Sequence, residues 1–437
     1  MFSIAPIFLP NSEPHRPMPR RHCQSFYAIL AAAFLSLAPI TSIAAPPLPR
    51  PAPRPADFAF IDTSIENGSP LHWDFAPDGS ILLSLQYDHE RDSPNRAAGH
   101  WHFRLEGKPG SSHTLVFQNF LNVWNGTSGL PVDARTACLL SDDGHTWRSE
   151  KMELVEQRVR LRVTLGPTGS LYVARVEPYR LSDLEKLLAR IRPHPLVALS
   201  VIGRTVEDRP LEIIRLGRES APHRVFLRAR AHPWEPGGNW VIEGLVAAVL
   251  ADTPAARAHL DHIAYYILPV ANKDGVARGR TRFNLRGIDL NRGWYNPPSP
   301  ELCPENHALE QWLAAMNARG LRPHLALELH NDNNGKLHVS RPAVPQLATY
   351  LENMKRLEAL LRQHTWFTEG STGATNHNPG TLGSGWLERF GITAAVLEFN
   401  AHWIAGKQKA PLGADWQEFG RALPAVFTDY FAPRAAP

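Results

Sequence analysis

His232 and Glu235, in the stretch RARAHPWEPGGNW, lie between two different local patterns. The run HRVFLRARA (223–231) before them is typical of a strand, and the run 240–250 after them is typical of a helix. An imidazole and a carboxylate at such a strand-to-helix turn can bind one metal ion, with a third ligand coming from elsewhere in an α/β fold. A surface ion pair is the alternative interpretation of the same two residues.

Two apolar runs further along the chain carry polar residues that suit the same site. LALELHNDN (325–333) contains His330, and ITAAVLEFN (392–400) contains Glu398. An acidic side chain on an otherwise buried strand costs on the order of several kcal/mol unless it has a partner. We therefore predict that His330 is the third metal ligand and that Glu398 is a general base acting on a metal-bound water.

The order of these features resembles that of the zinc carboxypeptidase family, the carboxypeptidase A-like metallopeptidases. The shared features are HPWE, then NKDG, an arginine in RTRFN, DLNR, and finally a His and a Glu that we expect at strand ends, over about residues 179–430. HPWE and GIDLNRGW are most similar to the cytosolic carboxypeptidase branch, whose members carry a β-rich domain before the catalytic one.

The resemblance implies one Zn²⁺ per chain. The implied zinc ligands are His232, Glu235 and His330. They would leave a fourth position for a water whose pKa falls to about 7, and Glu398 would accept its proton and pass it to the leaving amine.

The resemblance also assigns roles to four residues of the stretch RTRFNLRGIDLNRGW. Arg282 would stabilise the oxyanion, and Asn291 and Arg292 would bind the terminal carboxylate of the substrate. Asp289 would orient the first zinc histidine. Without the resemblance, the arginines could be solvated loop residues and Asp289 a simple turn carboxylate.

Two features depart from the family. No tyrosine lies between Tyr350 and Tyr430, so the role of the mobile tyrosine of pancreatic-type members is vacant or belongs to another group such as Trp386. The stretch GTLGSGW (380–386) lacks the arginine that glutamate-trimming members carry there. The sequence therefore leaves the preferred C-terminal side chain open.

The first residues predict export. Arg16, Arg20 and Arg21 precede a short apolar run (26–40) and the small residues SIA, a pattern typical of a cleavable signal peptide over 1–44. The run is too short for a permanent span, so we expect a secreted or periplasmic protein with no stable membrane insertion after cleavage.

The remaining organisation follows from composition. Residues 45–56 are a proline-rich linker, and 57–178 read as short alternating strands of a β-sandwich. From 179 to 432, strands alternate with helices, which predicts an α/β catalytic domain with a mixed central sheet flanked by helices.

Charge and cysteine content limit the partners. The chain has 46 basic and 42 acidic residues, a net charge of +4, which argues against a nucleic-acid partner. After cleavage the chain keeps Cys138 and Cys303, which we expect to be isolated thiols. The oligomeric state and the role of the β-domain have no signature in the sequence.

The sequence therefore predicts a zinc metallocarboxypeptidase that hydrolyses the C-terminal bond of peptides with a free C-terminus. A periplasmic amidase or peptidase acting on cell-wall peptides with non-standard linkages is the alternative that keeps the zinc chemistry. An inactive binding module on the same fold is a third interpretation, and the presence of every ligand, the base and both arginines argues against it.

Overall fold

The computed structural model describes residues 52–124, 126–374 and 379–433. The predicted signal peptide and most of the predicted linker lie outside the described residues. Among the described residues, no helix is both long enough and apolar enough to cross a membrane. The boundary near residue 178 stays a prediction, although the last strand of the β-rich region ends at Ala174 and the first helix begins at Leu181.

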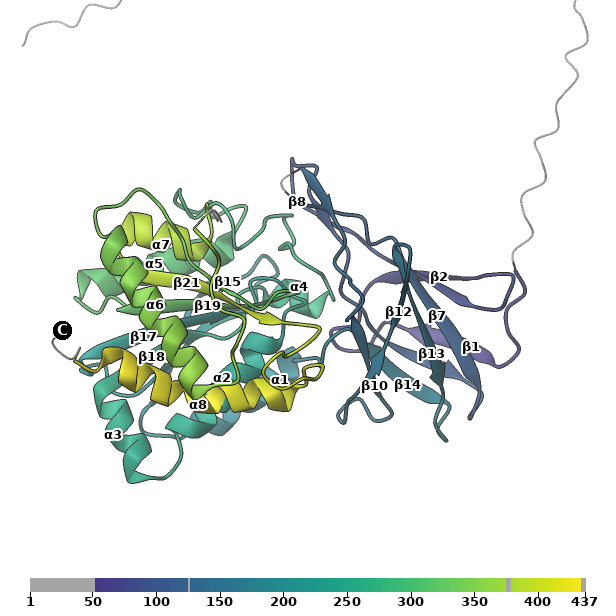
Figure 1. Ribbon diagram of the computed structural model, residues 1–437, viewed down its shortest axis with the longest axis horizontal. Coiled ribbons are helices and arrows are strands. Elements are labelled where there is room, and N and C mark those ends of the chain that lie inside the picture. The colour runs from purple at the N-terminus through teal and green to yellow at the C-terminus, as the bar shows by residue number, and fades with distance from the viewer. Residues whose placement is uncertain (1–51, 125, 375–378, 434–437) are drawn as a thin grey trace, which may run out of the picture. The chain divides into compact units, whose positions relative to one another are not determined.

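The N-terminal region is rich in strands and forms two five-stranded sheets around one apolar core (Figure 1). Alternation builds this core: on β13 the side chains of Val159, Leu161 and Val163 are buried and those between them are exposed. The first sheet contains, in spatial order, β1 (Phe58–Asp62), β6 (His102–Gly107), β14 (Ser170–Ala174), β10 (Ala137–Ser141) and β11 (Arg148–Lys151). The second contains β12 (Glu153–Val155), β13 (Arg158–Thr164), β7 (Ser112–Gln118), β3 (Ile81–Leu85) and β2 (Leu71–Phe75).

A smaller sheet of four short strands also belongs to the N-terminal region. Its strands are β4 (Asp88–His89), β5 (Arg96–Ala97), β8 (Asn122–Trp124) and β9 (Thr127–Gly129). We call it the small sheet.

The C-terminal region is built on a seven-stranded mixed sheet, which confirms the predicted fold class. Its spatial order is β15 (Val197–Arg204), β16 (Pro210–Leu216), β18 (Ile263–Leu268), β17 (His223–Ala229), β19 (Leu325–Asp332), β21 (Thr393–Asn400) and β20 (Leu337–His338). The four central strands are parallel and the outer ones antiparallel.

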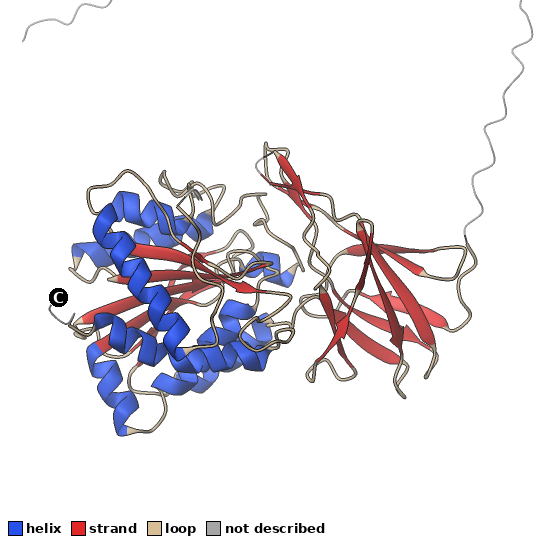
Figure 2. Cartoon of the chain, viewed as in Figure 1, coloured by secondary structure: helices blue, strands red, loops and turns tan. Residues whose placement is uncertain are grey.

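Helices cover this sheet, whereas the N-terminal region consists of strands and loops (Figure 2). The helices are α1 (Leu181–Ile191), α2 (Gly237–Val249), α3 (Pro254–His262), α4 (Lys273–Ala277), α5 (Pro304–Ala318), α6 (Leu347–His364), α7 (Leu382–Phe390) and α8 (Gly413–Phe431). The sequence predicts helices over 183–191, 240–250, 304–319, 344–363 and 416–431, and these are present as α1, α2, α5, α6 and α8. In this region, α3, α4, α7 and the outer strands β15 and β20 were not predicted.

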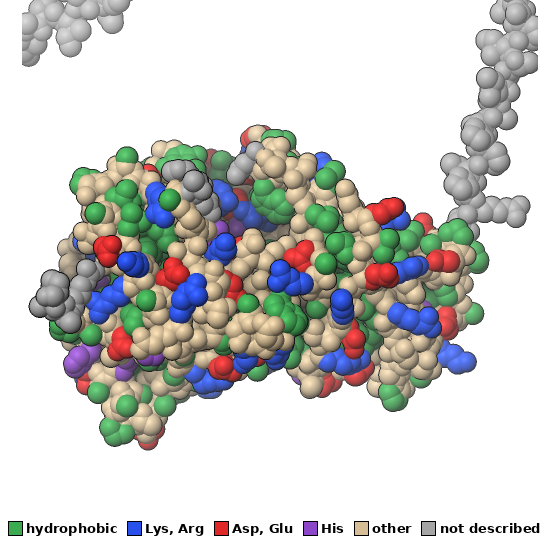
Figure 3. Space-filling view, in the orientation of Figure 1, with side chains coloured by type: hydrophobic (Ala, Val, Ile, Leu, Met, Phe, Trp, Pro, Cys, Tyr) green, Lys and Arg blue, Asp and Glu red, His purple; other side chains and the backbone are tan. Residues whose placement is uncertain are grey.

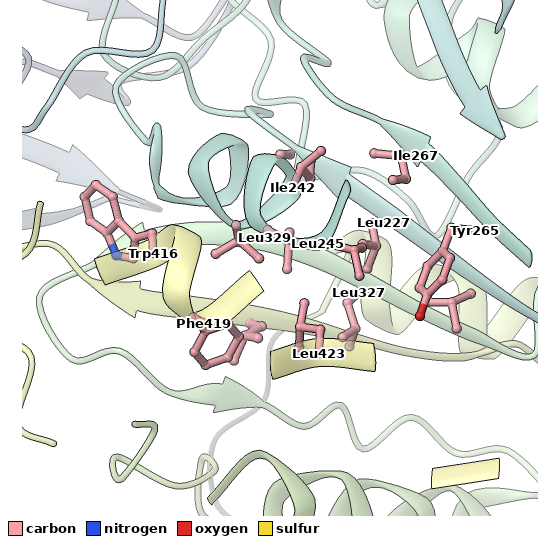
Figure 4. Packing of buried hydrophobic residues seen from close by; sticks show 14 of the residues in the cluster. Leu227, Ile242, Leu245, Tyr265, Ile267, Leu327, Leu329, Trp416, Phe419 and Leu423 are labelled. Atoms are coloured by element: carbon pink, nitrogen blue, oxygen red, sulfur yellow. The ribbon is translucent and has the colours of Figure 1, made fainter. Parts of the chain in front are cut away.

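Alternate side chains of the central strands point to opposite faces and pack against different helices. Leu227 and Leu329 pack with α2 and α8, as Figure 4 shows for Leu245 and Leu423. Phe226 points the other way, into a cluster with residues of α5 and α7. Burial on both faces explains why these strands are apolar throughout rather than alternating.

Charged side chains of both signs are interspersed over the visible surface (Figure 3). Cys138 and Cys303 are both buried and free, as the sequence analysis expected.

Candidate metal centre and active site

The candidate site lies at the carboxyl ends of the parallel strands, where ligands collect in open α/β sheets. β17 ends at Ala229, and the chain turns to present His232 and Glu235 before α2 begins at Gly237. β19 supplies His330 and β21 supplies Glu398. These two residues are direct neighbours in the strand register, so both side chains leave the same face of the sheet. His330 lies inside β19, which continues to Asp332, and not at the strand end.

Three buried residues converge so that they could hold one metal ion. His232 Nδ1 lies 2.8 Å from Glu235 Oε1, and His330 Nδ1 lies 2.6 Å from Glu235 Oε2. The ligand atoms of the three residues all lie within 4.8 Å of one another. All three side chains are nearly fully buried, which excludes the surface ion pair as an interpretation of His232 and Glu235. Two imidazoles and a carboxylate suit zinc.

The outer nitrogen of each imidazole is held by a polar neighbour. His232 Nε2 lies 3.0 Å from Asp289 Oδ1, and His330 Nε2 lies 3.2 Å from Asn291 Nδ2 and 3.4 Å from Glu328 Oε1. Such contacts fix ring orientation and leave each Nδ1 directed at the centre of the site. The donor set therefore fits a zinc ion.

Asp289 is shared between the metal centre and an arginine. One of its oxygens contacts His232, and the other accepts hydrogen bonds from Arg282 Nε at 2.8 Å and Nη2 at 2.6 Å. Burial opposes ionisation, but Arg282 and then His232 hold the pKa of Asp289 well below its usual range. Asp289 also accepts from the backbone N–H of Asn291, as a turn carboxylate would, so both interpretations of this residue describe real contacts.

Glu398 faces the same space and is poised to accept a proton. Burial raises the pKa of Glu398 well above its usual range, and the nearby Asp332 carboxylate raises it further. Its Oε2 atom is buried and has no hydrogen-bond partner among the described residues. A carboxylate whose pKa is raised toward neutrality is a better general base than one with an ordinary pKa.

The residues predicted to bind the substrate carboxylate differ in how free their side chains are. Arg292 lines the cavity and donates one hydrogen bond, from Nη1 to its neighbour's carbonyl oxygen at 2.8 Å. Both ends of the Asn291 amide are already engaged: Nδ2 lies beside His330, and Oδ1 accepts from the N–H of Leu382 at 3.0 Å. The substrate-binding role of both residues stays a prediction, and Arg292 has the more available side chain.

The site opens into a cavity of about 310 Å³, which several residues without a predicted role also line. These include Asp332 and His338, which together with Glu398 form a second group of possible ligand atoms. They also include Asn122, Trp124, Leu130 and Pro131 of the N-terminal region.

Trp386 cannot take the place of the missing tyrosine. It is fully buried and packs against Phe226 and Trp294 in the core beneath the sheet. It is therefore a structural residue of α7, and the proposed substitute role is wrong.

Glu328 was missed, although the sequence signal that pointed to Glu398 applies to it. It is a carboxylate inside an apolar strand, fully buried, and its Oε1 lies 2.7 Å from Nη1 of the fully buried Arg228. The same oxygen of Glu328 lies 3.4 Å from His330 Nε2, so this ion pair helps to hold the His330 ring in place.

Comparisons with known proteins find similar sequences and similar folds. Residues 184–332 match the family model described as zinc carboxypeptidase. Mouse (Mus musculus) cytosolic carboxypeptidase 6 is 33% identical over 121 residues, which cover 26% of this chain and 22% of that protein. Human (Homo sapiens) cytosolic carboxypeptidase 4 is 31% identical over 144 residues, which cover 33% of this chain and 12% of that protein. These matches thus span less than a quarter of either relative.

Solved structures show the same fold over most of the chain. A metallo-carboxypeptidase from Burkholderia cenocepacia superposes with a TM-score of 0.74 at 22% identity, covering 85% of this chain and 98% of that one. A metallo-carboxypeptidase from Pseudomonas aeruginosa, in complex with (2-guanidinoethylmercapto)succinic acid, gives 0.68 at 20% identity, covering 85% and 100%. The resemblance found in the sequence is confirmed: residues 184–332 match the zinc carboxypeptidase family model, and the solved metallo-carboxypeptidases share the fold.

Proposed function

We propose that this chain is a zinc-dependent carboxypeptidase that removes residues from the free C-terminus of peptides. The convergence of His232 Nδ1, His330 Nδ1 and the Glu235 carboxylate carries the proposal, because it creates one centre within reach of Glu398. The dicarboxylic acid bound by the Pseudomonas aeruginosa relative is consistent with a site that accepts carboxylates.

The chain would divide the reaction among four groups. His232, Glu235 and His330 would hold zinc, which when bound lowers the pKa of a water and polarises a carbonyl group. Glu398 would accept the proton of the attacking water and return it to the leaving amine. Arg282, fixed by Asp289, would donate to the carbonyl oxygen as negative charge develops there. Arg292 would bind the terminal carboxylate.

Replacing Glu398 tests this division of labour. Glu398→Gln should keep about one zinc per chain, measured by atomic emission, while kcat falls by about 10²–10⁴-fold or more because the base is lost. Glu185→Gln, on the exposed face of α1, is the matched control and should change neither quantity. A Glu398→Gln protein with near-normal kcat would contradict the proposal.

A substrate panel separates the alternatives. Free-acid peptides, the same peptides with amidated ends, and cell-wall peptides with non-standard linkages should be offered to the unaltered protein. Cleavage restricted to free-acid peptides supports the carboxypeptidase, and preference for cell-wall linkages supports the periplasmic amidase. Zinc binding without cleavage of any of them supports a binding module.

We also propose that residues 1–44 direct export and that the protein works outside the cytoplasm. The basic residues followed by a short apolar run in the sequence support this. N-terminal sequencing of the mature protein tests it, and a start within the first 44 residues would contradict it.

A further inference from the structure

The small sheet of the N-terminal region holds the loop that carries Arg282. Asp88 Oδ2, on β4, accepts hydrogen bonds from the backbone N–H groups of Thr281 at 2.8 Å and Arg282 at 2.7 Å. At the other end of the loop, the N–H of Arg91 donates to the carbonyl oxygen of Gly287 at 2.6 Å. Both ends of this loop are therefore fixed by the N-terminal region.

Trp124 of the same sheet lies against the Arg282 side chain. The guanidinium carbon lies 5.7 Å from the centre of the indole ring, within the range of a cation–π contact. Arg282 thus lies between Asp289, which accepts its hydrogen bonds, and Trp124. The indole also lines the active-site cavity.

Both regions of the chain line the cavity. Arg292, Thr381 and Val396 come from the C-terminal region, whereas Trp124, Leu130 and Pro131 come from the N-terminal region and offer a mainly apolar surface. We call these three residues of the N-terminal region the apolar wall.

Arg175, which also lines the cavity, holds the apolar wall in place. Arg175, which is almost fully buried, donates from Nη2 to the carbonyl oxygen of Pro131 and from Nη1 to that of Gly99, both at 2.6 Å. Its guanidinium also lies 3.9 Å from the centre of the Trp234 ring. These contacts hold Arg175 against the Pro131 carbonyl and so fix this part of the apolar wall.

We propose that Trp124, with Leu130 and Pro131, binds the penultimate side chain of the substrate and favours aromatic or large apolar residues there. This inference rests on the proposed carboxypeptidase activity. If Arg292 binds the terminal carboxylate and Arg282 the carbonyl oxygen of the scissile bond, the peptide continues past Arg282 toward Trp124. The N-terminal domain is then part of the active site and reads the residue before the cleaved bond.

Paired peptides test the proposal. Each pair has an acetylated N-terminus and the same C-terminal residue, with Phe or Gly before it. The unaltered protein should prefer the Phe peptide, and Trp124→Ala should lower kcat/KM for the Phe peptide by about tenfold more than it lowers kcat/KM for the Gly peptide. Trp124→Phe should retain most of the preference. Phe60→Ala, which removes an exposed aromatic ring that does not line the cavity, is the control.

Binding gives a readout that does not depend on turnover. In a Glu398→Gln background, calorimetry should show that Trp124→Ala weakens binding of the Phe peptide by about tenfold more than it weakens binding of the Gly peptide. Equal losses on both peptides would mean that Trp124 only positions Arg282, and would overturn the proposal. So would the absence of any loss. Failure of the unaltered protein to bind or cleave any free-acid peptide would instead overturn the carboxypeptidase assignment.

Discussion

Asp289 shows how closely the metal centre and the substrate site are joined at the scale of single residues. Its two oxygens contact His232 and Arg282, so one carboxylate orients both a proposed zinc ligand and the arginine proposed to bind the substrate carbonyl. A displacement of the Asp289 side chain would therefore disturb the positions of both His232 and Arg282. The loop carrying Asp289 also carries Arg292, which allows one segment to fix the direction in which a peptide lies.

Replacing Arg292 tests the direction in which the peptide lies in the site. A charge-assisted contact with a carboxylate contributes about 1.5–3 kcal/mol, so amidating the substrate should lower kcat/KM by about tenfold to a hundredfold. Arg292→Ala should cause a similar loss on the free acid and little further loss on the amide. Steady-state kinetics on both peptides measures this, and Arg286→Ala, an exposed arginine of the same loop, is the control. A variant that is equally impaired on both substrates would show that Arg292 only braces its own loop.

At the scale of elements, two glycines allow α2 and α8 to approach each other closely. A Cβ atom at Gly244 would lie 2.0 Å from the carbonyl oxygen of Gln417, and one at Gly420 would lie 1.9 Å from that of Val241. Alanine at either position would push the helices apart, and these helices cover the face of the sheet that carries Leu227 and Leu329.

Gly420→Ala should therefore destabilise the protein by about 1–3 kcal/mol, as overpacking does. The sign of the change in the free energy of unfolding is informative, because alanine in place of a helical glycine otherwise stabilises a helix by about 1 kcal/mol. Urea unfolding measures the difference, with Gly373→Ala as the control, since no atom lies within 4 Å of a Cβ at that position. A stabilised Gly420→Ala protein would contradict this description of the contact.

The elements also show which parts of the structure a sequence can predict. The strands that carry His330 and Glu398 were predictable because burial on both faces leaves an apolar run in which a polar residue stands out. The start of α3 was also readable, since Thr253 caps it and Pro254 follows, but these signals were missed. By contrast, α7 contains Gly383 and Gly385, which disfavour a helix; packing requires them, since a Cβ at Gly385 would lie 2.3 Å from the carbonyl oxygen of Trp294.

The candidate site was predictable where one short segment carries the signal, and not where distant segments meet. His232 and Glu235 lie together in the sequence. Asp88 and Trp124 reach the site only through tertiary contacts, since Asp88 and Arg282 are 194 residues apart, and no local pattern marks them. The engagement of the Asn291 amide by His330 and Leu382 is likewise a property of the assembled fold.

At the scale of the whole molecule, Asp88 links the N-terminal region to the catalytic loop and should make stability depend on pH. Burial raises the pKa of Asp88 from 3.8 to about 6, against the opposing effects of the Arg282 N–H and the Arg280 guanidinium. The folded state thus holds the proton more tightly than the unfolded chain. The contribution of Asp88 to the free energy of unfolding is then fully present below about pH 4. It is lost as the pH rises to about 6, which lowers stability by up to about 3 kcal/mol.

Urea unfolding at a series of pH values should reveal this decline. Asp88→Asn keeps an oxygen that can accept a hydrogen bond but removes the titration, so the contribution of this residue to the slope between pH 4 and 6 should disappear. An unchanged slope in that variant would assign the effect to other carboxyl groups.

The contacts of Asp88 and Trp124 with the Arg282 loop have a consequence for how the protein folds during synthesis. Asp88 and Trp124 precede the loop in the chain, and domains that emerge first from the ribosome generally fold first. If the N-terminal region follows this general order, the surface that binds the loop forms before the loop itself is synthesised. The N-terminal region would then help to shape the candidate site during synthesis, although all three proposed metal ligands come from the C-terminal region. In a protein with the order of the two regions reversed, the loop would be synthesised before the surface that binds it.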